Sequence, residues 1–463
     1  MPELIEIINE NLTGFTETRF LVIVIITSIL TLTIGSISSS KLCKGSIFII
    51  GLTGAFFYLP SYETLNFNGN LLIDHRSVSI ARITIMSTLG LLLFDAFWKR
   101  AIEQWFLLLA LLAGSLLMMI GQNLLIIYLS IEFVSLTSYV LTSFQRKKSG
   151  YEATLKYFLV GCVVSAVMLY GISLIYGGQG HLYLPTNGLV SKVSVLGWLM
   201  FLSGLLFKTS LFPIHGWVPN TYQEAPTEVS AFLAVVPKLS GFVLLGVILD
   251  VIQNQMISNL LLLLGLATMV IGTFGAISQQ NVKRLISYGA IAHSGFILPL
   301  ILLPDADNSF LVYCTVYGIM TYAAFYFISV HETFNFHTLD NYKGVGMLVP
   351  STAIAGVIFM VALVGLPPTS GFTIKFFLFV ELWKAYLTNG SISFLIYFII
   401  GILTSVISLF FYLRIPYISF FKKSEVSFAP RKHMEIIMIF FALFLLFSFL
   451  LPGTLTIAIA QFY

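Results

Sequence analysis

Charge is scarce in this sequence. Only 10% of its 463 residues are Asp, Glu, Lys or Arg, whereas an average soluble domain has about 25%. Hydrophobic residues make up 58% of the chain. This balance excludes a soluble globular protein and leaves no room for a soluble second domain. We therefore predict an integral membrane protein that lies in a lipid bilayer, with no nucleic acid among its partners.

Cysteine is equally scarce. The chain has Cys43, Cys162 and Cys314, which lie far apart with no CxxC spacing and no nearby histidine pattern. Neither a metal site nor an iron–sulfur cluster is therefore indicated. The sequence also lacks a phosphate-binding loop and a nicotinamide-binding fingerprint. We predict no cofactor, no metal and no redox chemistry on this chain itself.

What the sequence does contain is long hydrophobic runs, each long enough as a helix to cross a hydrocarbon core of roughly 30 Å. We predict an all-α integral membrane protein, a single polytopic domain over residues 1–463 with about 14 transmembrane helices. The predicted helices cover residues 19–39, 45–60, 77–97, 103–121, 122–144, 151–176, 192–222 with a break, 227–250, 257–278, 283–303, 309–332, 347–386 with a break, 391–418 and 433–460.

Basic residues are concentrated in alternate connections between the predicted helices, and the positive-inside rule assigns these connections to the cytoplasm. Both termini are then predicted outside the cytoplasm. The alternation also supports the count of 14, because adding or dropping one span would disturb it downstream; thirteen spans is the main alternative. The basic residues assigned to the cytoplasmic side are Lys41, Lys44, Lys99, Arg100, Arg146, Lys147, Lys148, Lys283, Arg284, Lys343, Lys422, Lys423, Arg431 and Lys432.

Two predicted helices are interrupted. The seventh contains Pro213 and Pro219, and the twelfth contains Pro367, Pro368 and Gly371. Each proline removes a backbone donor, and non-helical backbone at membrane depth is tolerated only where protein or a watery cavity surrounds it. Both breaks are therefore expected to face the interior of the helix bundle.

The two broken helices lie five spans apart, so they cross the membrane in opposite directions. Such a pair is the usual sequence trace of an inverted repeat, with the ion path between the two halves. We therefore divide the chain into helices 1–3 (residues 1–102), a first repeat of helices 4–8 (103–250), a second repeat of helices 9–13 (251–420) and helix 14 (421–463).

Four ionisable residues lie deep within predicted spans: Glu132, Lys208, Lys238 and Lys375. A charge at the bilayer centre costs about 2.5 to 3.5 kcal/mol on insertion scales, so such residues usually mark a pathway for charge. Glu132 is the natural counter-charge of Lys208, and carbonyls freed by the first break could solvate the Lys208 ammonium. A packing role is the alternative for Glu132 and Lys208, and snorkelling to the surface is the alternative for Lys375.

Lys238 follows Pro237, which leaves the carbonyl of Leu233 without its helical donor. That carbonyl could accept a hydrogen bond from water or from Lys238 itself. Burial disfavours the charged form of a lysine, so Lys208 and Lys238 could both exchange a proton near neutral pH. A purely structural role is again the alternative.

Three further residues are weaker candidates for a proton relay. Lys156 lies early in the sixth span, where Glu152 at i−4 could simply pair with it on the helix surface. His215 follows Pro213 in the first break, and His293 lies in the tenth span. Histidine titrates near neutral pH and can relay protons, but a lone histidine in a helix bundle is often a hydrogen-bonding packing residue. Both alternatives stay open for each histidine.

Four ordered motifs carry a resemblance to a known family. They are EATLKYFLVGCVVSAVMLYGISLIYG, LLFKTSLFPIHGWVPNTYQEAPTEVSAFLAVVPK, NVKRLISYGAIAHSGF and GLPPTSGFTIKF. Together they resemble the antiporter-like membrane subunits of respiratory complex I over about residues 75–415, most closely its N subunits. The M subunits of that family and the Mrp antiporter subunits usually carry glutamate where this chain has Lys375.

The resemblance implies a subunit of a proton-translocating NADH:quinone oxidoreductase, which couples electron transfer in other subunits to proton pumping. It implies that Glu132, Lys208, Lys238 and Lys375 form the proton route. It also implies, as partners, the other membrane and peripheral subunits of complex I, including neighbouring antiporter-like subunits. NADH, FMN, iron–sulfur clusters and quinone are then expected in those partners, and the location is the bacterial inner membrane with both termini periplasmic.

Two other functions are considered beside this one. The first is a cation/proton antiporter subunit of the Mrp type, against which Lys375 argues. The second is a passive scaffold that links neighbouring membrane subunits. A scaffold would keep proton pumping intact after the substitution Lys238→Ala.

Overall fold

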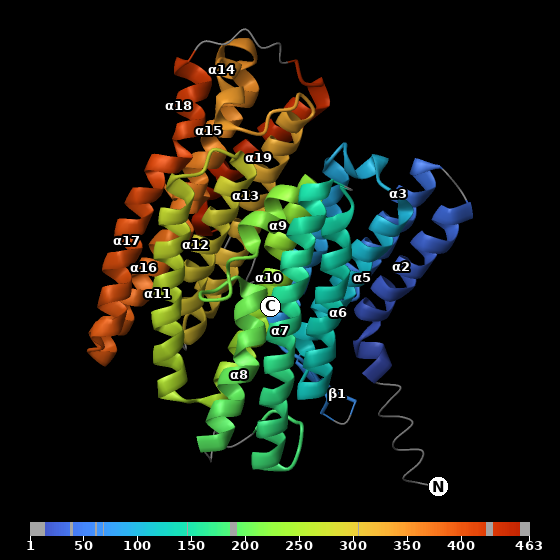
Figure 1. Cartoon of the computed structure of the whole chain (residues 1–463), viewed down its shortest axis with the longest axis vertical. Coiled ribbons are helices and arrows are strands. Elements are labelled where there is room, and N and C mark those ends of the chain that lie inside the picture. Colours follow the sequence, from blue (N-terminus) through green and yellow to red (C-terminus); the bar gives the residue numbers. More distant parts are fainter. Residues whose placement is uncertain are drawn as a thin grey trace. The chain divides into compact units, whose positions relative to one another are not determined.

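The computed structural model describes residues 14–37, 40–60, 63–67, 69–145, 147–185, 192–303, 305–422 and 429–453. The described chain is almost entirely α-helical (Figure 1). The described residues form two compact units, one from those within Met1–Thr209 and Val236–Ile257 and the other from those within Ser210–Val235 and Ser258–Gln461. Helix α10 (Thr227–Ile252) contributes its first turns to the second unit and the rest to the first.

The first unit contains seven further long helices among its described residues and a small hairpin. Asp74 begins α4 with a capping box, and the side chain of Asn123 caps α6, so both helix starts have satisfied backbone donors. The elements are α2 (Arg19–Ile37), α3 (Lys41–Phe57), β1 (Thr64–Asn66), β2 (Leu71–Ile73), α4 (His75–Gly90), η1 (Leu91–Leu93), η2 (Phe97–Lys99), α5 (Ile102–Ile120), α6 (Leu124–Ser143), α7 (Lys148–Gln179) and α8 (Lys192–Thr209). The strands β1 and β2 pair antiparallel, with Leu65 opposite Leu72.

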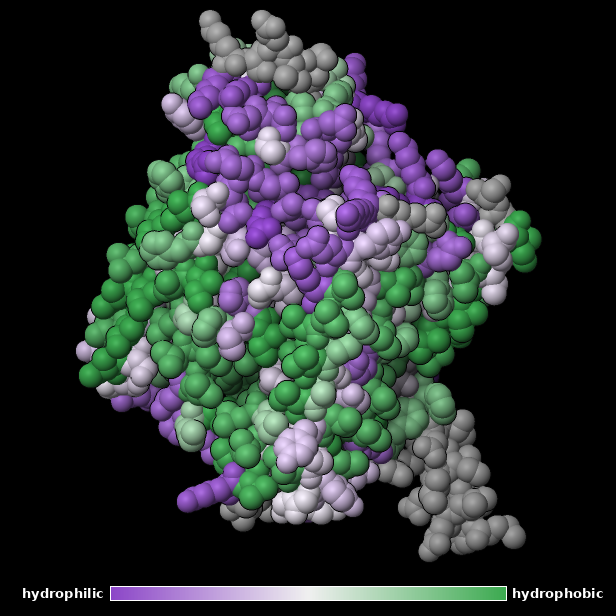
Figure 2. Space-filling model, viewed as in Figure 1, coloured by the Kyte–Doolittle hydropathy of each residue, from purple (hydrophilic) through white to green (hydrophobic). Residues whose placement is uncertain are grey.

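The second unit contains the remaining helices. Its outward faces are apolar, as expected for a protein surrounded by lipid: Ile399, Leu403 and Phe410 are exposed on α17, and Figure 2 shows hydrophobic surface along this helix. The elements are α9 (Val218–Glu224), α11 (Gln255–Ile277), α12 (Val282–Leu302), α13 (Asp307–Glu332), η3 (Leu339–Tyr342), α14 (Val345–Leu348), α15 (Pro350–Val364), α16 (Ser370–Asn389), α17 (Ile392–Tyr412), α18 (Arg414–Phe421) and α19 (Lys432–Leu450).

Both predicted breaks are present. Helix α8 ends at Thr209 and α9 begins at Val218, so the chain leaves the helical path between them. Helix α15 ends at Val364, and Gly365 follows with φ +85°, a left-handed conformation that glycine adopts without steric cost. Helix α16 then begins at Ser370.

The predicted all-α membrane architecture is confirmed, and each predicted span corresponds to a helix or a pair of helices. Twelve helices of the described residues are long and apolar enough to cross a bilayer. The segments below that threshold include α3 and the two halves of the second broken helix, α15 and α16. The count of 14 spans therefore stays a prediction, and the predicted end of the last span at residue 460 lies outside the described residues.

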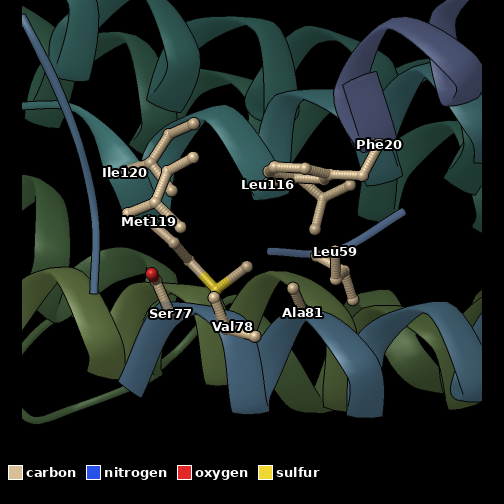
Figure 3. A pocket seen from close by; sticks show the side chains of 9 residues that line it. Phe20, Leu59, Ser77, Val78, Ala81, Leu116, Met119 and Ile120 are labelled. Atoms are coloured by element: carbon tan, nitrogen blue, oxygen red, sulfur yellow. The ribbon is translucent and has the colours of Figure 1, made fainter. Parts of the chain in front are cut away.

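An apolar pocket lies in the first unit between α2, α4 and α5 (Figure 3). Its lining contains no titratable side chain, and its one hydroxyl, from Ser77, belongs to the capping box of α4. The pocket therefore offers no chemistry for proton or metal binding. The residues that line it are Phe20, Leu59, Ile73, Ser77, Val78, Ala81, Leu116, Met119 and Ile120.

Candidate functional site

Lys375 lies in the second turn of α16, immediately after the second break, and its side chain is buried. Its Nζ donates to the backbone oxygen of Val364 at 2.7 Å and to Oγ of Ser405 at 3.1 Å. The same nitrogen lies 4.5 Å from the centroid of the Phe296 ring, within the range of a cation–π contact. Helices α15, α17 and α12 thus supply three contacts to one ammonium, and all three are neutral.

His293 is buried in α12 and reaches the same break. Its Nδ1 lies 2.8 Å from the hydroxyl of Tyr313, and its Nε2 lies 3.2 Å from the backbone oxygen of Leu363. A carbonyl oxygen only accepts, so the contact with Leu363 assigns a hydrogen to Nε2. In a neutral ring, Nδ1 then accepts from Tyr313.

The carbonyl end of α15 therefore joins the two candidate residues. The last four carbonyls of a helix have no donor from within the helix. Here Leu363 accepts from His293, and Val364, one residue later, accepts from Lys375. The break in the helix creates these acceptors in a buried place, where an unsatisfied carbonyl would be costly. Sequence reasoning expected freed carbonyls to solvate Lys208 at the first break; the structure shows this arrangement at Lys375 and the second break.

Lys208 and Glu132 both lie in the first unit. Lys208 is buried near the end of α8, and in the part of the chain that the structure describes its Nζ has no hydrogen-bond partner. The nitrogen lies 5.4 Å from the centroid of the Phe207 ring. Glu132, on α6, accepts from Oγ of Ser165 on α7, and no direct contact between Glu132 and Lys208 is found among the described residues. The carbonyl solvation predicted for Lys208 is not found among the described residues.

Lys238 is fully buried in α10, which continues as a helix through Pro237. The carbonyl of Leu233, which Pro237 deprives of its helical donor, accepts from the hydroxyl of Tyr222 at 3.1 Å. The next carbonyl, that of Ala234, accepts from the hydroxyl of Tyr317 at 3.0 Å. Sequence reasoning expected water or Lys238 as the donor at Leu233 and did not foresee the tyrosine.

Lys156 and His215 occupy different surroundings. Nζ of Lys156 lies 2.6 Å from Oε1 of Glu152, and both side chains are more than half exposed. The surface pair that was weighed against a relay role is thus formed. His215 lies between α8 and α9, and among the described residues its Nδ1 has no hydrogen-bond partner. Neither placement tests a relay role, so both roles stay predictions.

A buried ion pair escaped the sequence reasoning. Lys283 was assigned to a cytoplasmic connection, but its side chain is only 5% exposed in the first turn of α12. Its Nζ lies 3.1 Å from Oε1 of Glu332 and donates to the backbone oxygen of Ala225 at 2.8 Å. Glu332 also accepts from the hydroxyl of Thr227, the first residue of α10. The pair therefore fixes the start of α10.

One signal in the sequence pointed to that pair. Glu332 is the last residue of α13, where the carbonyl end of the helix carries partial negative charge. A carboxylate there is unfavourable unless a cation lies nearby, so its position indicates a basic partner. No comparable signal identifies Ser405 or Phe296, because hydroxyl and aromatic residues are common on the packed faces of membrane helices.

Known proteins resemble this chain over most of its length. Residues 121–408 match the family described as NADH:quinone oxidoreductase/Mrp antiporter, TM. The chain belongs to this family. A relative, NADH-quinone oxidoreductase subunit N 1 of Thermodesulfovibrio yellowstonii, is 35% identical over 384 residues, which cover 79% of this chain and 81% of that protein. The resemblance that the four motifs indicated is confirmed.

Two solved structures extend the comparison to the fold of the family. A chain of respiratory complex I from Thermus thermophilus, solved with bound aureothin, is 27% identical and has a TM-score of 0.82, with 95% of this chain and 99% of that chain covered. A chain of the Mrp complex from Dietzia sp. DQ12-45-1b has a TM-score of 0.81 at 18% identity, with 95% of each chain covered. The likeness to the Mrp chain shows the shared fold alone.

Proposed function

We propose that this chain is a proton-translocating membrane subunit of an NADH:quinone oxidoreductase. Electron transfer takes place in partner subunits, which hold NADH, FMN, iron–sulfur clusters and quinone. The partners are the other membrane and peripheral subunits of complex I, including neighbouring antiporter-like subunits. The family match and the subunit N relatives support this assignment.

The proposed proton route uses Glu132, Lys208, Lys238 and Lys375. The observation that carries it is the second break, where His293 and Lys375 bind successive carbonyls of α15. Lys375 is buried but forms no ion pair among the described residues, so it can release its proton without leaving a carboxylate uncompensated. That is the behaviour a relay group needs.

The direction and the switching of the route are part of the proposal. A proton enters from the cytoplasm toward Lys208, passes to Lys238 and then to Lys375, and leaves on the outer side. Formation and loss of an ion pair between Glu132 and Lys208 would change the proton affinity of the lysine. Moving one charge against 100 mV takes about 2.3 kcal/mol, so the energy comes from the partner subunits.

The placement in the cell follows the same reasoning. The family resemblance supports a position in the bacterial inner membrane, and the alternating basic connections support an orientation with both termini periplasmic. The two breaks support the inverted repeat, with residues 103–250 as the first copy and 251–420 as the second. His215 and His293 are proposed as auxiliary relay groups. For Lys156, the exposed ion pair with Glu152 supports the surface role over the relay role.

The substitution Lys238→Ala tests this function in the assembled complex. Inverted membrane vesicles would be supplied with NADH, and proton uptake would be followed with a pH-sensitive dye. We expect proton uptake to be lost, whereas Lys156→Ala, a matched change at an exposed lysine, should leave it unchanged. Unchanged pumping in Lys238→Ala would favour a scaffold, and sodium-driven proton exchange without NADH would favour an Mrp-type antiporter.

A further inference from the structure

We propose that Phe296 and Ser405 are positioning residues that hold the ammonium of Lys375 at the carbonyl end of α15 and set how readily it releases its proton. The inference rests on the proposed function of Lys375 as a relay group. It adds two residues with no titratable group of their own, one from α12 and one from α17.

The hydroxyl of Ser405 is oriented for this task. Its Oγ donates to the backbone oxygen of Gly401 at 2.9 Å, one turn earlier in α17. With its hydrogen committed there, the oxygen presents a lone pair, and Nζ of Lys375 donates to it at 3.1 Å. Ser405 therefore stabilises the protonated lysine and has no second hydrogen with which to stabilise the neutral amine.

Phe296 acts on the same charge from another side. It lies three residues after His293, so both side chains project from one face of α12 toward the break. Its ring centroid is 4.5 Å from Nζ of Lys375, and the negative face of an aromatic ring attracts a cation but not a neutral amine. Like Ser405, Phe296 favours the protonated form.

The other groups that face Lys375 do not replace these contacts. Helix α15 has no titratable side chain. Among the described residues, no carboxylate forms an ion pair with Lys375, and Glu381 on its own helix pairs instead with Lys384. Glu435, on α19, accepts from Ser351 at the opposite end of α15. The packed helices carry further titratable groups, among them His293 of α12, Tyr313 and Tyr317 of α13, and Tyr397 and Tyr412 of α17.

The test is the pH profile of NADH-driven proton pumping in vesicles that contain the assembled complex. Phe296→Leu and Ser405→Ala each remove one contact that favours protonated Lys375. Lys375 should then lose its proton at lower pH, so the alkaline limb of the profile should move to lower pH by roughly one unit in each variant. A role limited to packing would lower the rate at every pH and leave the limb in place.

Matched variants separate the contact from general effects of substitution. Phe296→Tyr keeps the ring and Ser405→Thr keeps the hydroxyl, so both should retain the original alkaline limb. Ser408→Ala removes another hydroxyl of α17. That hydroxyl donates to the backbone oxygen of Ser405 and makes no hydrogen bond to Lys375. This variant should also leave the limb in place.

Lys375→Met is measured in parallel to separate the two proposals. If Lys375→Met loses pumping while Phe296→Leu and Ser405→Ala keep the alkaline limb of the unmodified complex, the positioning role is wrong and the relay role stands. If Lys375→Met pumps normally, Lys375 is not a relay group, and both the positioning role and the proposed place of Lys375 in the route are wrong. A shifted limb in both single variants, with retention in Phe296→Tyr and Ser405→Thr, supports the positioning role.

Discussion

Two buried lysines of the second unit, Lys283 and Lys375, differ in the charge of their partners. Each lysine donates a hydrogen bond to a backbone carbonyl, and each is at most 5% exposed. Lys283 lies 3.1 Å from the carboxylate of Glu332. Among the described residues, the partners of Lys375 are all neutral: the carbonyl of Val364, the hydroxyl of Ser405 and the ring of Phe296.

The difference separates a structural cation from a group that can exchange its proton. If Lys283 lost its proton, the largely buried carboxylate of Glu332 would keep only the half-exposed ring of His337, 3.8 Å away and charged only when protonated, and a poorly compensated buried charge is expensive. If Lys375 lost its proton, its neighbours would still be neutral. A buried lysine is therefore suited to proton relay when its partners stabilise the charge without fixing it, and burial alone does not distinguish the two cases.

Substitution of Lys375 by methionine should have the largest effect on function. Methionine keeps a similar volume and removes the ammonium of Lys375, which we propose as a relay group at the second break. We expect proton pumping to fall roughly 100-fold or more, the size of effect seen when a proton-transferring group is lost. Dye-monitored pumping in vesicles measures it, with the assembled fraction of the complex as control. Retained pumping would remove Lys375 from the route.

Lys283→Met should instead affect stability. It leaves Glu332 without its cation and Ala225 without its donor, which should cost roughly 3 kcal/mol. The unfolding temperature of the purified complex and the assembled fraction of the subunit would report the loss. The double substitution Lys283→Met with Glu332→Leu removes both charges and should recover part of that stability. Equal losses in the single and double variants would show that the ion pair is not the source.

Gly365→Ala should have an intermediate effect that again concerns Lys375. Gly365 has φ +85°, where an alanine costs about 1 kcal/mol, and an added Cβ would lie 2.6 Å from Cδ of Lys375. The lysine must move, so pumping should fall severalfold. Gly390→Ala is the matched control, because Gly390 also has a left-handed φ of +62° and its added Cβ would meet nothing within 4 Å. Equal pumping losses in both variants would argue against displacement of the lysine.

The fold was largely predictable because hydrophobic runs and prolines act locally. Each span is long enough to be recognised by its length, and Pro367 and Pro368 marked the second break in the sequence. Helix α10 shows the limit of this reasoning, because it continues through Pro237 where a break was conceivable. The carbonyl of Leu233, which has lost its helical donor, accepts instead from the hydroxyl of Tyr222, a residue of another helix.

The site was predictable in its charged members and not in their partners. A lysine in an apolar run is conspicuous, so Lys375 could be selected from sequence alone. Its contacts with Val364, Ser405 and Phe296 depend on how four helices pack, and no local pattern specifies that packing. The partner of Lys283 on α13 was not foreseen for the same reason, since a lysine beside a connection gives no sign of a buried carboxylate.

Lys156→Ala should have the smallest effect, because Lys156 is an exposed lysine, unlike the buried Lys283 and Lys375. Its ion pair with Glu152 lies on the surface of α7, where both charges remain more than half exposed. Exposed pairs contribute little, so the unfolding temperature of the complex should not change measurably. Pumping should also be retained, because this lysine is held by a carboxylate as Lys283 is, and not by neutral groups as Lys375 is. A loss of pumping as large as that in Lys375→Met would place Lys156 in the relay and would show that a carboxylate partner does not disqualify a lysine from exchanging its proton.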